Sequence, residues 1–223
     1  MSASPPFLHD PVEHLLSALQ QVPQRRWIVG IAGLPGSGKS TIAQALATAV
    51  NQAAGAPVAM ALGMDGFHLT RAQLRAFPDP EAALLRRGAP WTFDPQGLAQ
   101  RLALLRSQPA QALTWPGFEH GVGDPVADAL QVPPSVRLVL LEGLYLLHDD
   151  HGWDLRGAMD ARWFLDVPRD VAMARLAARH QAAWGITRDE ALARIARNDG
   201  LNAEAVWRSR ARADALVADA LRP

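Results

Sequence analysis

A glycine-rich octapeptide, GLPGSGKS at residues 33–40, holds the only lysine of the chain. Of the 22 lysine and arginine residues 21 are arginine, so Lys39 stands out from the composition. The octapeptide fits the pattern G-x-x-x-x-G-K-[ST], in which glycines let backbone N–H groups converge on phosphate oxygens. A lysine ammonium is a compact charge that reaches between the β- and γ-phosphates. The segment therefore predicts a binding site for a nucleoside triphosphate.

The phosphate contacts of such a loop extend into the helix that follows it. A helix N-terminus adds free N–H donors and a partial positive charge, and both favour bound phosphate. Lys39 is expected to act in catalysis as well as in binding, and Ser40 to provide a Mg²⁺ ligand. The predicted nucleotide-binding residues are Gly33, Leu34, Pro35, Gly36, Ser37, Gly38, Lys39, Ser40 and Thr41.

Two carboxylates lie at the ends of apolar runs that are typical of buried strands. Glu142 closes the run VRLVLLEG, and Asp65 follows PVAMALGM. In an open α/β sheet, ligands bind beyond the carboxyl ends of the strands, so both side chains should face Lys39. We expect Glu142 to bind Mg²⁺ together with Ser40, and Asp65 to accept the proton of an attacking hydroxyl. Each carboxylate could instead serve only as the first residue of a loop or turn.

A kinase also needs cations on a mobile segment, which neutralise the transferred phosphoryl group and exclude water. The run PRDVAMARLAARH carries Arg175 and Arg179, which are four residues apart and hence on one helix face. Gly185 should end this helix within HQAAWGIT, so we expect a small lid over about residues 175–190. The alternative is that both arginines lie on an ordinary solvated face.

Strand and helix patterns alternate along the chain, which predicts a mostly parallel sheet flanked by helices. The expected strands cover 25–33, 57–64, 136–143, 161–167 and 216–221. The expected helices cover 11–21, 37–52, 95–108, 168–184, 187–200 and 202–214, with Asp94, Thr187 and Asn202 as N-caps. Residues 70–94 should be irregular or partly helical, and 111–135 a loop or short hairpin. The chain is therefore expected to form one α/β domain over residues 1–223, with the P-loop NTPase fold and a small lid.

Charge and composition narrow the class of protein. The 22 acidic residues balance the 22 basic ones, and the absence of a basic block predicts no nucleic-acid partner. The guanine-binding motif Asn-Lys-x-Asp cannot occur, because Lys39 is the only lysine, so ATP is favoured over GTP. The chain has no cysteine, and no apolar run reaches the roughly 20 residues of a membrane span. A cytoplasmic protein with no membrane partner is expected, and a homo-oligomer stays open.

Several segments together resemble the uridine kinase / phosphoribulokinase / type I pantothenate kinase superfamily. The resemblance covers about residues 27–215 and rests on GLPGSGKST, MDGFHL, RRGAPWTFD, PGFEH followed by DP, LLEGLYLL and the arginine-rich helix. Within the superfamily the chain is most similar to bacterial nucleoside/nucleotide kinase-like proteins. The resemblance implies a P-loop kinase that uses ATP and Mg²⁺.

The resemblance also implies roles for single residues. The aspartate of the DGF-like segment is the base for the acceptor hydroxyl, and the segment like RRGAPWTFD lines the acceptor pocket. The histidine after the Pro-x-aromatic segment, here His120, contacts the acceptor in pantothenate-type members. His68 and His120 could instead be ordinary polar residues of loops. The lid arginines are Arg175 and Arg179. The predicted substrate-binding residues are Asp65, His68, Arg87, Phe93, Asp94, His120 and Tyr145.

The acceptor itself stays open at this point. Uridine kinases have an Asp-Ser-Phe-Tyr-like segment where this chain has Asp65-Gly66-Phe67-His68, which is closer to pantothenate kinases. The chain is nevertheless shorter than pantothenate kinases and differs from them in its C-terminal half. The predicted function is therefore transfer of the ATP γ-phosphoryl group to a hydroxyl of a small metabolite of the nucleoside, vitamin or sugar type. The alternative is a P-loop ATPase that regulates or binds a partner and has no small-molecule acceptor.

Overall fold

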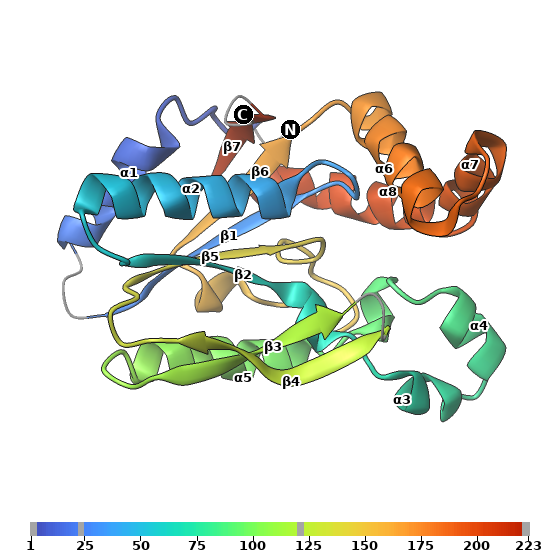
Figure 1. Cartoon of the computed structure of the whole chain (residues 1–223), viewed down its shortest axis with the longest axis horizontal. Coiled ribbons are helices and arrows are strands. Elements are labelled where there is room, and N and C mark those ends of the chain that lie inside the picture. The colour runs from blue at the N-terminus through green and yellow to red at the C-terminus, as the bar shows by residue number, and fades with distance from the viewer. Residues whose placement is uncertain (1–3, 22–24, 120–122, 220–223) are drawn as a thin grey trace.

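Five parallel strands form the centre of residues 4–21, 25–119 and 123–219, the part of the chain that the structure, a computed structural model, describes. Their order across the sheet is β2-β5-β1-β6-β7. All pairings between them are parallel, so their carboxyl ends share one edge (Figure 1). The strands are β1 Trp27–Gly33, β2 Ala59–Gly63, β5 Leu138–Gly143, β6 Ala161–Asp166 and β7 Ala215–Ala218.

Continuous apolar runs explain the central strands. WIVGIAG in β1 and LVLLEG in β5 are buried at nearly every position, as a parallel sheet with covered faces requires. The expected strands at 25–33, 57–64, 136–143 and 161–167 are confirmed, with ends shifted by one or two residues. The expected strand at 216–221 begins one residue earlier, as β7, and residues 220–221 lie outside the described part.

The helices flank the sheet, and several of them gather at its carboxyl edge. In Figure 1, α2 crosses in front of the sheet, while α6, α7 and α8 lie together at the end where α2 begins, and α3 and α4 lie below them. Within the described residues, no helix has the length and apolar content needed to span a bilayer. The α-helices are α1 Pro11–Gln21, α2 Lys39–Ala54, α3 Arg71–Arg75, α4 Pro80–Leu85, α5 Pro95–Ser107, α6 Arg169–Trp184, α7 Arg188–Arg197 and α8 Asp199–Ser209, and the 3₁₀-helices are η1 Met64–Phe67, η2 Pro90–Thr92, η3 Arg156–Ala158 and η4 Arg210–Arg212.

Local capping signals set most helix ends. Asp94 caps α5 by accepting a hydrogen bond from Gly97 N at 2.8 Å, and Thr187 forms a capping box at the start of α7. Gly185, with φ of 64°, ends α6. The predicted cap at Asn202 is wrong, because α8 begins at Asp199 and already includes this residue. The Asn202 side chain is buried and bonds to another segment of the chain instead, which no local pattern reveals.

The segment predicted as a loop or short hairpin is a hairpin. Its strands, β3 Leu113–Glu119 and β4 Asp124–Val132, pair antiparallel, with an irregularity between Trp115 and Gly117. Trp115 is fully buried and donates from Nε1 to the carbonyl of Gly63 at 2.8 Å. This bond attaches the hairpin to the end of β2, beside the edge of the sheet where ligands bind in such folds.

Candidate active site

The loop after β1 has the backbone geometry of a phosphate-binding loop. Gly36 and Gly38 have φ values of 77° and 94°, a region that residues with a side chain rarely adopt. The Ser37 hydroxyl is buried and has no hydrogen-bond partner within the described part of the chain. An unpaired buried hydroxyl is costly, so a ligand oxygen at this position would satisfy it. The loop therefore offers this hydroxyl and backbone N–H groups to an anion.

Gly36 also brings the loop against α6. A Cβ at this position would collide with the carbonyl oxygen of Ala172, so only glycine permits the contact. Arg175, one turn further along α6, donates to the carbonyl of Ser37 at 3.4 Å. Because of these two contacts, the helix that carries the predicted lid arginines starts directly on the phosphate-binding loop.

Lys39 lies between two carboxylates at the end of the sheet. Its side chain is 8% exposed, and its ammonium donates to the Leu34 carbonyl at 3.0 Å. Burial lowers the pKa of Lys39, while the charges of Glu142 and then Asp65 oppose that shift. Burial likewise raises the pKa of Glu142, against the attraction of Lys39. The structure therefore brings together the ammonium and both carboxylates that the sequence predicted for this site.

Because Lys39 is the only lysine, a chemical experiment can test its place in the nucleotide site. Saturating MgATP is expected to slow modification of Lys39 by an amine-reactive probe about tenfold or more, because the bound phosphates would cover the ammonium. Peptide mass spectrometry would measure the rate, with Mg²⁺ alone as the control and Lys39→Arg to identify the labelled peptide. A rate that does not respond to nucleotide would contradict the assignment.

Ser40 and Glu142 fit a magnesium ion bound between protein and phosphate. The Ser40 hydroxyl donates to Oε1 of Glu142 at 2.9 Å, and both residues line a cavity of about 460 Å³. Mg²⁺ prefers oxygen ligands and commonly takes only one or two from the protein, the others coming from water and substrate phosphates. A hydroxyl and a carboxylate at hydrogen-bond distance match that requirement.

Asp65 is positioned by η1, directly after β2. Its backbone carbonyl accepts hydrogen bonds from His68, whereas no residue of the described ranges donates to its carboxylate oxygens. The next residue must be glycine, because a Cβ on Gly66 would collide with the backbone of Pro116 in the hairpin. A serine, as in uridine kinases, does not fit here. The backbone of Asp65 is therefore held in place by contacts on both sides.

Asp65 lines two cavities. The cavity of about 460 Å³ is lined by Ser40 and Glu142, and a second one, of about 730 Å³, by Arg179 of α6. Phe118 of the hairpin is also shared by both. A reactant in the larger cavity can therefore meet a phosphate in the smaller one at Asp65.

The predicted acceptor residues divide into two groups. His68, Arg87 and Phe93 line the larger cavity together with Asp65. Asp94 and Tyr145 are not among the residues that line it: Asp94 is exposed at the cap of α5, and Tyr145 is buried and donates to the carbonyl of Gly88 at 2.6 Å. Tyr145 thus supports the wall of the cavity from behind. The remaining prediction, His120, lies outside the described residues.

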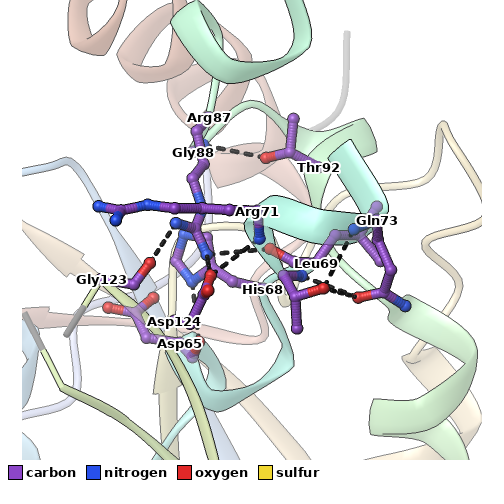
Figure 2. Close-up of polar contacts among 11 residues, drawn as sticks. Asp65, His68, Leu69, Arg71, Gln73, Arg87, Gly88, Thr92, Gly123 and Asp124 are labelled. Atoms are coloured by element: carbon purple, nitrogen blue, oxygen red, sulfur yellow. Dashed lines mark hydrogen bonds and ion pairs between the residues drawn. The ribbon is translucent and has the colours of Figure 1, made fainter. Parts of the chain in front are cut away.

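The larger cavity has an ordered polar wall (Figure 2). The guanidinium of Arg87 donates to the carbonyls of Leu69, at 2.9 Å, and Gly123, and pairs with Asp124 at 2.8 Å. Asp124 also accepts from the backbone N–H of Arg71 at 2.9 Å. These contacts join the start of α3, the turn before η2 and the hairpin into one wall.

The two lid arginines have different partners. Arg179 lines the larger cavity, and its charge opposes protonation of Lys39. Arg175 pairs with Asp219 at 2.6 Å besides contacting Ser37. The structure therefore brings only Arg179 to the space beside Asp65 and places Arg175 against the loop.

Several residues that line the larger cavity were not predicted from the sequence. Asn198 donates from Nδ2 to the Arg87 carbonyl at 2.9 Å, and Asn202 to the Gly88 carbonyl at 3.1 Å. Asp199 and His180 also line this cavity, and Oδ2 of Asp199 lies 3.7 Å from Nε2 of His180. Burial raises the pKa of Asp199, and the charge of His180 opposes that shift. The sequence predicted a break between two helices near residue 200, but such a break does not show which residues Asn198, Asp199 and Asn202 contact.

Comparisons with known proteins show the family of this chain. The profile of the Phosphoribulokinase / Uridine kinase family matches residues 28–220. A protein of Schizosaccharomyces pombe provisionally named a uridine kinase is 40% identical over 182 residues, covering 80% of this chain and 77% of its own. The Escherichia coli protein YggC is 38% identical over 217 residues, 94% and 85% of the two chains. A solved Silicibacter structure, provisionally described as a fructose transport system kinase, superposes with a TM-score of 0.80 at 36% identity over 93% and 98% of the chains. The chain belongs to the Phosphoribulokinase / Uridine kinase family of P-loop kinases.

Proposed function

We propose that this protein is a kinase that transfers the γ-phosphoryl group of ATP to a hydroxyl of a small metabolite. The main support for this function is the position of Asp65. This residue lines both the cavity of Ser40 and Glu142 and the larger cavity of Arg87 and Arg179. A purely hydrolytic ATPase has no need of a second cavity of about 730 Å³ that meets its catalytic carboxylate. This volume suits a small organic molecule.

Each residue of the nucleotide side has a separate task. The backbone of residues 33–41 and the Lys39 ammonium hold the phosphates. Ser40 and Glu142 are the ligands that would hold Mg²⁺, which when bound neutralises charge on the phosphates. Glu142 pairs with β1 at Ile31 and with β2 at Gly63, so its backbone is fixed within the sheet. This rigid mounting fixes the distance between the ligand pair and Lys39.

On the acceptor side, Asp65 would accept the hydroxyl proton and direct the oxygen toward the γ-phosphorus. Arg179 would neutralise charge that develops on the transferred group. Both residues line the larger cavity. His68, Arg87 and Phe93 would contact the acceptor, and the family resemblance implies the same role for His120.

The lid belongs to this proposal. We place it at about residues 175–190, which covers the second half of α6, the break at Gly185 and the start of α7. Closure of this segment would bring Arg179 onto the phosphoryl group and exclude water. Thr187 and Glu190 fix the start of α7, so motion would be concentrated at the break. The proposal treats the remainder of residues 1–223 as one kinase domain.

The balanced charge of the chain bears on its partners and its location in the cell. Equal numbers of acidic and basic residues, 22 of each, favour a small-molecule partner over a nucleic acid. We propose a cytoplasmic location without a membrane partner, and a homo-oligomer is compatible with it. The acceptor type is a nucleoside, a vitamin or a sugar derivative.

Release of ADP that depends on an acceptor tests the function. ADP formation by the full chain is expected to rise at least about tenfold over basal hydrolysis with one class of compound in a panel of nucleosides, vitamins, sugars and their phosphates. A coupled enzyme assay measures the rate, and mass spectrometry of the product identifies the phosphorylated compound. Basal hydrolysis that no compound stimulates would favour the alternative, a P-loop ATPase with a regulatory or partner-binding role.

A further inference from the structure

Two arginines converge at one corner of the larger cavity, where the hairpin meets α3 (Figure 2). Arg71 and Arg87 both line this cavity. The guanidinium of Arg87 donates to the Gly123 carbonyl, and a Cβ on Gly123 would collide with the guanidinium of Arg71. Both positive groups therefore lie against the same residue of the hairpin.

The charge at this corner is not balanced. Asp124 is the carboxylate that pairs with Arg87, and a backbone hydrogen bond from Arg71 lowers the pKa of Asp124 and keeps it ionised. Within the described residues, no carboxylate hydrogen-bonds to or forms an ion pair with the Arg71 guanidinium. Within the cluster of Arg71, Arg87 and Asp124, two cations and one anion leave an excess of one positive charge.

The excess charge is not needed for the nucleotide. Neither Arg71 nor Arg87 is among the residues that line the cavity of Ser40 and Glu142, the proposed Mg²⁺ ligands. Lys39 already provides positive charge near Glu142, and Arg179 lies close enough to oppose its protonation. The two arginines at the hairpin are therefore available to the second reactant.

The corner is also built to hold a ligand group. Arg87 is fixed by its carbonyl and carboxylate partners and lies over the Phe118 ring at 5.4 Å, so its orientation is set in advance. Arg71 is exposed, and its guanidinium lies beside Gly123, the residue that Arg87 also contacts. The lining of the cavity also includes apolar side chains that suit a short carbon skeleton: Leu84, Leu85, Phe93, Phe118 and Leu144.

We propose that the acceptor carries an oxyanion, either a phosphomonoester or a carboxylate, and that Arg71 binds it beside the fixed guanidinium of Arg87. An arginine fork matches the paired oxygens of both groups. The inference rests on the proposed function, because it assigns the hydroxyl of the same molecule to Asp65. It narrows the acceptor to hydroxylated anions and disfavours free nucleosides and neutral sugars.

Binding to the full chain, with the phosphate-binding loop saturated by MgADP, tests the proposal. The probes are matched triples that differ only in the anion: glycerol, glycerate and glycerol 3-phosphate, and then the corresponding neutral, carboxylate and phosphate forms of ribose and glucose. Titration calorimetry should show at least one anionic member binding about tenfold or more tightly than its neutral counterpart. Preference for the phosphate or for the carboxylate member decides between the two sources of the oxyanion.

Arg71→Met is expected to weaken binding of the preferred anion about ten- to a hundredfold and to leave the neutral member unchanged. The matched control is Arg75→Met, which removes an exposed arginine of the same helix that is not among the cavity-lining residues. A panel without any anionic preference, or a preference that survives in Arg71→Met, would overturn the proposal.

Acceptor-dependent ADP release with the same panel separates this proposal from the kinase function. Stimulation by neutral and anionic members alike would support the kinase and overturn the oxyanion site. Tight, Arg71-dependent binding of an anion without any ADP release would support the site and count against the kinase function.

Discussion

Asp65→Asn is expected to lower phosphoryl transfer about 10²- to 10⁴-fold, the usual contribution of a general base, while ATP binding is unchanged. The amide retains the size of the carboxylate but cannot accept the hydroxyl proton. The Asp65 backbone holds η1 through its carbonyl, and no described residue bonds to its carboxylate, so the substitution should preserve the local structure. Steady-state kinetics with the stimulating acceptor and calorimetric titration with ATP measure the two quantities.

Glu142→Gln provides the comparison for this variant. Glu142 accepts from Ser40 at 2.9 Å and is assigned to the metal, so its loss should raise the Mg²⁺ concentration needed for half-maximal activity. Asp65→Asn should leave that concentration unchanged. If Asp65→Asn retains wild-type turnover, or if its defect disappears at high Mg²⁺, Asp65 is not the base.

The second large effect concerns stability. Arg26→Met is expected to reduce the free energy of unfolding by about 3–5 kcal/mol, which corresponds to a urea midpoint lower by about 1–2 M. Arg26 is fully buried, and the partners of its guanidinium in the described part of the chain are carbonyl groups. Truncation would leave these carbonyls buried without a donor, which costs more than the bonds contributed. The acceptors are the carbonyls of Leu105, Gln108, Gln111, Pro133 and Val136, at 2.8–3.4 Å.

Arg25→Met is the matched control for this measurement. Its side chain is 44% exposed and pairs with Asp160, which also pairs with Arg106. Asp160 is largely buried but keeps Arg106 as a partner when Arg25 is removed, so the loss should be at most about 1 kcal/mol. Equal midpoints for the two variants would show that the buried guanidinium does not hold the carboxyl end of α5 to the segment before β5.

Local chemistry made much of the nucleotide side predictable. The turn of residues 33–40 depends on glycines at positions with positive φ, and the strand before it on a buried apolar run. Caps such as Asp94 and Thr187 act within three residues of their own position, so sequence spacing is enough to find them. The two carboxylates followed from a general property of parallel sheets, since strand ends meet at one edge.

The acceptor side could not be predicted to the same depth. Its wall consists of segments far apart in sequence that are joined by side-chain bonds, such as Asn198 to the Arg87 carbonyl. Asparagine is a common N-cap residue, yet in the folded chain the Asn202 side chain donates to the Gly88 carbonyl instead. Arg87 is useful only because Asp124 and the hairpin orient it. No periodicity or propensity encodes such pairings.

The sequence by itself determined the family and the fold class, and it predicted the residues of the phosphate-binding loop, Lys39 most clearly among them. Those features are local, because the loop, the strand before it and the helix after it are continuous in the chain. Only the tertiary structure decided which side chains share the second cavity with Asp65 and that Arg71 stands there without a carboxylate partner in the described chain. Charge balance in a cavity is a property of packed segments, so it exists only once α3, the hairpin and α6 have come together.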